Sequence, residues 1–163
     1  MSAERLDSQN LFDVAAGLPE QVADAARAAK NLDRLPTKEH IENVVVLGMG
    51  GSGIAGDILL ATAAPFMPVP VVVVKGYELP AFVGEGSLVI AISFSGNTEE
   101  TIEAATEAAM QGAKMAVVAS GGGLADLAQG WGAPVVGVPT SIPQPRAAIG
   151  ALAIPPLVML EQV

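Results

Sequence analysis

The sequence contains no cysteine and only one histidine among its 163 residues. Without thiols, the chain can form neither a disulfide nor a thiolate metal site. The single histidine, His40, lies in a charged stretch and has no second imidazole with which to share a metal ion. We therefore expect His40 to be a surface residue, and the protein to use no metal and no other cofactor.

Aromatic and charged residues are also scarce, at 4% and 15%, whereas 51% of the residues are hydrophobic. The core must then be built from valine, alanine, leucine and isoleucine, as is typical of parallel α/β sheets. Eight basic residues face 17 acidic ones, which gives a net charge of −9. Because no basic patch or basic arm is present, this composition argues against a nucleic-acid partner.

Long hydrophobic runs are missing as well. The longest, residues 147–160, is shorter than the roughly 20 residues of a membrane helix, and Pro155-Pro156 interrupts it. The first ten residues are polar and acidic, unlike a secretory signal peptide. The sequence thus predicts a soluble, cytoplasmic protein with no membrane partner.

Short apolar runs alternate with helix-forming segments along most of the chain. The apolar runs are continuous, which is typical of strands buried on both faces. This alternation predicts a parallel sheet covered by helices, in a domain over residues 43–163 that follows a helical lead-in over 1–42. Strands are expected at 44–47, 71–74, 88–92, 115–119 and 134–138, and helices at 19–30, 37–42, 54–63, 99–111, 124–129 and from 147 onward, with residues 1–17 loosely ordered.

The segment Ser-Phe-Ser-Gly-Asn-Thr, residues 93–98, joins the predicted strand 88–92 to the helix that follows. Asn97, three residues before Glu100, matches an N-cap signature. Helix amide groups and the positive end of the helix dipole point into such a turn. Three hydroxyls beside a glycine, Gly96, suit a phosphate monoester, although an ordinary hydroxyl-rich helix cap is the alternative. The hydroxyls belong to Ser93, Ser95 and Thr98.

A second turn, Gly48–Gly53, matches the dinucleotide-binding pattern G-x-G-x-x-G. In that pattern an acidic residue normally follows the next strand, but here the strand that ends at Val74 is followed by Lys75. A nicotinamide-dependent oxidoreductase stays open as an alternative. In a parallel sheet this turn and segment 93–98 lie at the same edge, so Ser52 would face one crevice together with the three hydroxyls of 93–98.

Arg146 is the only arginine after Arg34. Pro143 and Pro145 hold it in a constrained loop before a predicted helix. A cation placed in this way suits an anionic ligand, and a salt bridge that caps the helix is the alternative.

Three stretches carry a resemblance to a known family: GMGGSGIAGD, SFSGNTEETIEA and PQPRAAIG. Together they resemble the SIS (sugar isomerase) domain, and in particular the amino-terminal half of bifunctional phosphoglucose/phosphomannose isomerases. The resemblance covers the chain from about residue 40. It implies a three-layer, flavodoxin-like fold with a five-stranded parallel sheet. It also implies a sugar-phosphate site at Gly51, Ser52, Gly53, Ser93, Ser95, Gly96, Asn97 and Thr98, and a catalytic role for Arg146 in stabilising an enediolate.

The implied reaction interconverts glucose 6-phosphate or mannose 6-phosphate with fructose 6-phosphate. Such an isomerase needs a base and a ring-opening group, and we find neither in this sequence. In the family they come from a second SIS domain. We therefore expect a chain that binds hexose 6-phosphates, is inactive alone, and forms a homodimer or pairs with a second SIS domain. A non-catalytic sugar-phosphate-binding module is the other alternative.

Overall fold

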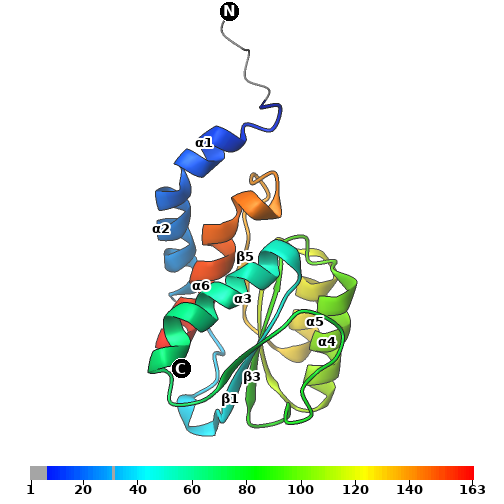
Figure 1. The fold of residues 1–163 in the computed structure, drawn as a ribbon. Coiled ribbons are helices and arrows are strands. Elements are labelled where there is room, and N and C mark those ends of the chain that lie inside the picture. The colour runs from blue at the N-terminus through cyan, green and yellow to red at the C-terminus, as the bar shows by residue number, and fades with distance from the viewer. Residues whose placement is uncertain (1–6, 31) are drawn as a thin grey trace, which may run out of the picture.

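The structure is a computed structural model that describes residues 7–30 and 32–163. A five-stranded sheet runs through its centre, and all neighbouring strands pair in parallel in the order β2-β1-β3-β4-β5 (Figure 1). This topology confirms the predicted parallel α/β fold. The strands are β1 Asn43–Leu47, β2 Val71–Val74, β3 Ser87–Ser93, β4 Lys114–Ala119 and β5 Val135–Gly137.

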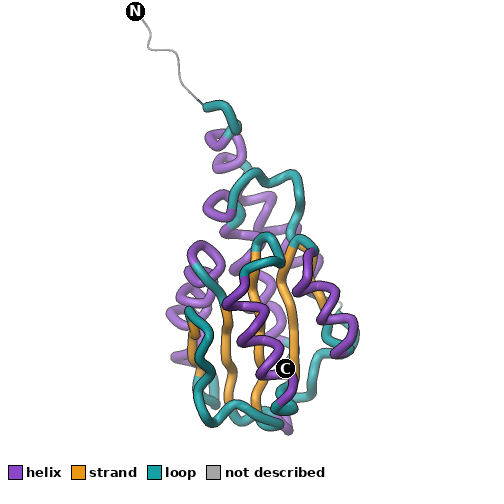
Figure 2. Tube along the Cα trace, turned by 90° about the vertical axis from the view of Figure 1, so that its right-hand side faces the viewer, coloured by secondary structure: helices purple, strands orange, loops and turns teal. Residues whose placement is uncertain are grey.

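Helices cover both faces of the sheet, which makes three layers (Figures 1 and 2). The helices are α1 Leu11–Ala16, α2 Leu18–Ala29, α3 Gly50–Ala63, α4 Glu99–Met110, α5 Gly122–Trp131 and α6 Ile149–Glu161, with short 3₁₀ turns η1 Lys38–His40, η2 Ala64–Phe66 and η3 Pro145–Ala147. Residues of α2, α3 and α6 share one hydrophobic core with the sheet, and residues of α4 and α5 share the other.

Side chains alternate between these two cores along each central strand. In β1, Val44 and Val46 enter the core below α3 and α6, while Val45 and Leu47 enter the core below α4. Every residue of β3 is buried. Because both faces of the strand are covered, its sequence is a continuous apolar run, which explains why the strands could be predicted from composition.

Several predicted boundaries are wrong for local reasons. Helix α3 begins at Gly50 and not at residue 54, because the glycine turn itself winds into the helix. The predicted helix 37–42 is only the three-residue turn η1. Residues 11–16 form α1 where a loosely ordered segment was expected, and residues 1–6 of that prediction lie outside the described residues.

The N-cap of α4 is Thr98 and not Asn97. Helix α6 continues through Pro155 and Pro156, which lie inside it and are buried. Among the described residues, no helix combines the length and the apolar character required to cross a bilayer.

Two helical glycines with different surroundings provide a test of this packing. A Cβ added to Gly56 of α3 would lie 2.9 Å from a Val73 methyl and 3.1 Å from a Val46 methyl, whereas one added to Gly130 of α5 would meet nothing within 4 Å. Overpacking typically costs about 1–3 kcal/mol, and replacing a helical glycine by alanine gains up to about 1 kcal/mol. We expect Gly56→Ala to lower the free energy of unfolding in urea and Gly130→Ala to raise it; equal effects would contradict the close helix–sheet contact.

Candidate functional site

The order of the strands reverses between β1 and β3. The chain leaves β1 for β2 on one side and then returns to place β3 on the other side. In open parallel sheets, ligands bind at the carboxyl ends of the strands at such a reversal. The glycine turn after β1 and the hydroxyl turn, residues 93–98, after β3 therefore flank the expected binding place.

A cavity of about 230 Å³ lies there, and we call it the hydroxyl cavity. Helices α3 and α4 both begin at its rim, so their amide groups and positive dipole ends are directed toward it. Three of the four predicted hydroxyls line it. Its lining residues are Met49, Gly50, Gly51, Ser52, Phe94, Ser95, Thr98 and Pro145.

Ser93, the fourth predicted hydroxyl, is fully buried and does not line the cavity. Its Oγ accepts a hydrogen bond from Gly96 N at 3.1 Å and lies 3.0 Å from Thr98 Oγ1. Ser93 thus stabilises the conformation of the hydroxyl turn from its buried side. Of the two bonded hydroxyl residues, Ser93 and Thr98, only Thr98 lines the cavity.

Ser52 joins the two turns to each other. Only 5% of its surface is exposed, and its Oγ accepts a hydrogen bond from Phe94 N at 3.1 Å. Ser95 is exposed, and its Oγ accepts a hydrogen bond from Asn97 N at 3.2 Å. Ser95 is therefore the most accessible of the four hydroxyls.

A third turn, residues 120–123 after β4, supports the hydroxyl turn; the sequence predicts a flexible turn there but not this contact. Ser120 Oγ donates to Phe94 O at 2.6 Å, and Gly123 N donates to Asn97 Oδ1 at 3.0 Å. A Cβ on Gly96, whose φ is +71°, would lie 1.7 Å from the Gly121 carbonyl oxygen. The two turns interlock so closely that only glycine fits at position 96. The sequence feature that could have indicated this contact is the Ser-Gly-Gly-Gly segment, residues 120–123, directly after a predicted strand.

Gly51 and Pro145 separate the hydroxyl cavity from a second one. A Cβ on Gly51 would lie 3.2 Å from Pro145 Cβ. The second cavity, of about 470 Å³, is lined by Gly51, Ile54, Pro145, Arg146 and Ile149, and we call it the arginine cavity. The structure thus places Arg146 beside the hydroxyls and not among them.

Arg146 is exposed on η3, and the described residues supply it with neither an ion pair nor a hydrogen bond. A salt bridge capping α6, the alternative considered for this residue, is therefore absent from the described part of the chain. An arginine left without a counter-ion in a chain of net charge −9 is available to an anionic ligand.

The segment after β2 begins with Lys75, which lies against the glycine turn. Lys75 Nζ pairs with Asp57 Oδ2 at 2.5 Å, and its stem would lie 3.2 Å from a Cβ on Gly53. Partial desolvation, followed by the nearby carboxylates of Glu100, Glu99 and Glu103, raises the pKa of the exposed Tyr77 above its ordinary value of 10.0. The residue after the strand is thus a lysine held by Asp57, and the acid that a dinucleotide ribose requires is not at that position.

A family model for the SIS domain matches residues 39–128, more than half of the chain. The chain belongs to the SIS domain family. This SIS domain is 40% identical over 153 residues to the bifunctional phosphoglucose/phosphomannose isomerase of Caldicellulosiruptor bescii, a match covering 94% of this chain and 45% of that protein. It is 43% identical to the enzyme of the same name from Thermoplasma acidophilum, over 69% of this chain and 34% of that protein.

Solved structures confirm the fold of this SIS domain. The C-terminal domain of glucosamine-fructose-6-phosphate aminotransferase from Francisella tularensis matches 99% of this chain and 50% of its own, with a TM-score of 0.69 and 18% identity. The NanR protein of Vibrio vulnificus, solved with ManNAc-6P, matches 95% of this chain and 63% of its own, with a TM-score of 0.67 and 21% identity. The SIS domain spans less than half the length of the two isomerases named above.

The contrast between buried and exposed hydroxyls leads to a prediction. Ser93→Ala removes the hydrogen bonds of the buried Oγ with Gly96 N and Thr98 Oγ1, while Gly96 N keeps its bond to Ser93 O. The loss of two hydrogen bonds should lower the free energy of unfolding by about 1–3 kcal/mol. Ser95→Ala, at an exposed position two residues away, is the matched control and should change it by less than about 0.5 kcal/mol. Urea unfolding measures both, and comparable losses would show that Ser93 has no special role in the turn.

Proposed function

We propose that this SIS domain is the sugar-phosphate-binding half of an aldose-ketose isomerase, which interconverts glucose 6-phosphate or mannose 6-phosphate with fructose 6-phosphate through an enediolate. The observation that carries the proposal is the hydroxyl cavity, at the start of two helices, beside an arginine that has no counter-ion among the described residues. The names of the related isomerases support it.

The phosphate group would occupy the hydroxyl cavity. Ser52, Ser95 and Thr98 present their hydroxyls there, and Gly50 and Gly51 leave the backbone open at the start of α3. Within the described ranges, no charged side chain lines the cavity, so the negative charge of the phosphate would be met by hydroxyls, amide groups and two helix dipoles. Gly53, Ser93, Gly96 and Asn97 would act by shaping the two turns.

Arg146 would act on the other end of the substrate. The arginine cavity shares Gly51 and Pro145 with the hydroxyl cavity, so a sugar held by its phosphate can extend past this contact toward the guanidinium. The enediolate is an anion that forms only after the first proton transfer. A planar cation placed beside it stabilises that state more than the bound sugar.

The proton-transfer groups would come from a second SIS domain. In the part of the chain that the structure describes, none of the residues lining the hydroxyl and arginine cavities is an aspartate, glutamate or histidine, which leaves no candidate base among them. The extra length of the related isomerases supports a two-domain site. We propose that the second domain belongs either to a longer form of this chain or to a second copy that forms a homodimer.

Titration with fructose 6-phosphate tests the phosphate site. Ser95→Ala and Thr98→Ala should each weaken binding by roughly tenfold to a hundredfold, because a hydrogen bond to a charged group contributes about 1.5–3 kcal/mol. Ser141→Ala, at an exposed serine outside the cavity, is the control and should bind normally. Calorimetry with a nicotinamide dinucleotide provides the opposing test: binding of the dinucleotide in place of the sugar phosphate would favour the oxidoreductase alternative.

Kinetics of the isomerase reconstituted with a second SIS domain test Arg146. We expect no turnover by this chain alone and isomerisation once the second domain is supplied. Arg146→Ala should then lower kcat by about 10²–10³ with little change in KM, and Arg146→Lys should recover only part of the rate. Turnover by residues 1–163 alone, or an unchanged kcat, would contradict the proposal; binding without turnover in the reconstituted protein would favour the non-catalytic module.

A further inference from the structure

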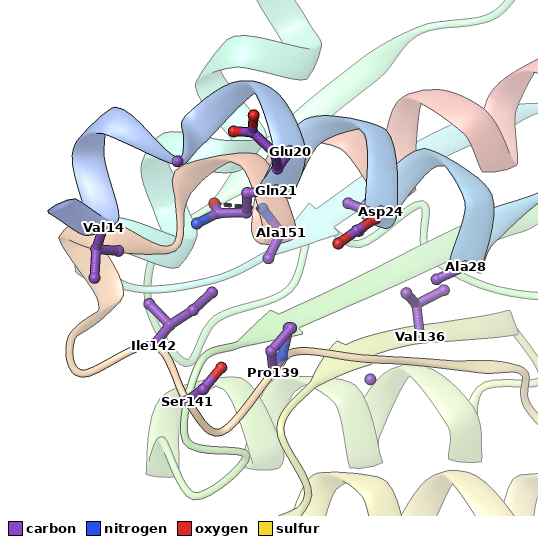
Figure 3. A pocket seen from close by; sticks show the side chains of 13 residues that line it. Val14, Glu20, Gln21, Asp24, Ala28, Val136, Pro139, Ser141, Ile142 and Ala151 are labelled. Carbon is purple, nitrogen blue, oxygen red and sulfur yellow. Dashed lines mark hydrogen bonds between the residues drawn. The ribbon is translucent and has the colours of Figure 1, made fainter.

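The turn that carries Arg146 is attached to a helix far away in the sequence. Gln21 of α2 donates from Nε2 to Ala147 O at 2.9 Å. Its Oε1 accepts from Ala151 N at 3.0 Å, the bond drawn dashed in Figure 3. Both partners lie more than 100 residues away in the sequence. A Cβ on Gly150 would lie 2.9 Å from the same Oε1. One side chain thus bonds to η3 and to the first turn of α6, on the two sides of the Ala148–Gly150 segment.

The backbone hydrogen bonds within this turn are local. Ala147 N donates to Gln144 O and Ala148 N donates to Pro145 O, each at 3.0 Å. Such short-range bonds fix the shape of η3 but not its position relative to the sheet. Helix α6 has no side-chain N-cap of its own, so Gln21 supplies the acceptor that the Ala151 amide would otherwise lack.

The loop before η3 is only loosely packed against α2. A groove of about 430 Å³ separates them, and Gln21 lies on its α2 wall (Figure 3). Because open space lies between the loop and α2, the loop does not pack closely against this helix, although its Ile142 is buried in the core. The groove is lined by Val14, Ala25, Ala28, Val136, Pro139 and Ile142, among other residues. A second link, between Gln9 and Gln144, lies at the exposed surface.

We infer that Gln21 is a positioning residue for Arg146. It fixes η3 relative to the hydroxyl cavity, so that the Arg146 guanidinium can contact the enediolate. This inference rests on the role proposed above for Arg146. A purely structural role, in which Gln21 only ties α2 to α6, is the competing explanation.

The chain contains a matched control for that explanation. Gln162 Nε2 donates to Ala29 O at 2.8 Å and to Val158 O at 2.9 Å. Gln162 therefore links the same two helices at their other ends, at the end of α6 opposite to η3. Methionine at either position keeps an unbranched side chain of similar length but removes the hydrogen bonds.

The test measures the affinity of the 163-residue chain for two probes by calorimetry. One probe is inorganic phosphate, and the other is a sugar-phosphate hydroxamate whose planar anionic head mimics an enediolate. Gln21→Met should weaken hydroxamate binding by roughly twofold to tenfold, the equivalent of one hydrogen bond, and leave phosphate binding unchanged. Gln162→Met should change neither affinity, although both variants should lose similar thermal stability. In the Arg146→Ala background, Gln21→Met should cause no further loss.

The outcomes separate the inference from the proposed function. If Arg146→Ala weakens hydroxamate binding but Gln21→Met behaves like Gln162→Met, the positioning role is overturned and the function of Arg146 stands. If Arg146→Ala has no effect on the hydroxamate, the role proposed for Arg146 fails, and the inference fails with it. Should Gln21→Met not fold, Gln21→Glu retains the acceptor for Ala151 N and loses only the donor to Ala147 O, and the same comparison applies.

Discussion

The complete burial of β3 is the constraint on which the rest of the structure depends. Its side chains fill both cores, and its backbone pairs with β1 and β4 on its two sides. Polar side chains along such a strand are confined to its ends, where the chain leaves the sheet. The hydroxyl turn starts at Ser93, the last residue of β3. It therefore opens at the edge where the neighbouring strands end as well, and their turns interlock with it through Ser52, Ser120 and Gly121.

This arrangement separates two chemical tasks. The hydroxyl cavity has no charged lining residue among those described, and the turns after β1 and β3 that line it are joined to each other and to the turn after β4 by hydrogen bonds. Arg146 lies on a different element, η3, which depends on α2 for its position. In the function proposed here, the phosphate grip is rigid because its turns interlock, and the catalytic cation is aligned by a helix from the beginning of the chain. The N-terminal helices thus contribute to the site as well as to the core.

Much of the fold could be predicted because its signals are local. Continuous valine and isoleucine runs marked the strands, and β2 was predicted with its observed bounds, Val71–Val74. The two turns at the strand-order reversal were found because glycine and hydroxyl residues cluster after these runs. The roles of individual residues were harder to predict. Asn97 was expected to cap α4, but its side chain accepts a hydrogen bond from Gly123, a residue of another turn. Ser93 was expected in the crevice and lies beneath it.

By itself, the sequence determined the parallel α/β class, the SIS family and the two turns, because strand burial, helix formation and turn geometry depend on residues close together in the chain. The tertiary structure alone decided which hydroxyls are open to a ligand, that the turn after β4 clamps the turn after β3, and that Gln21 holds the turn of Arg146. These features depend on contacts such as the 2.9 Å hydrogen bond between Gln21 and Ala147, whose partners lie 126 residues apart. No local pattern encodes such a contact, since it forms only when the packing of α2 against α6 brings the two residues together.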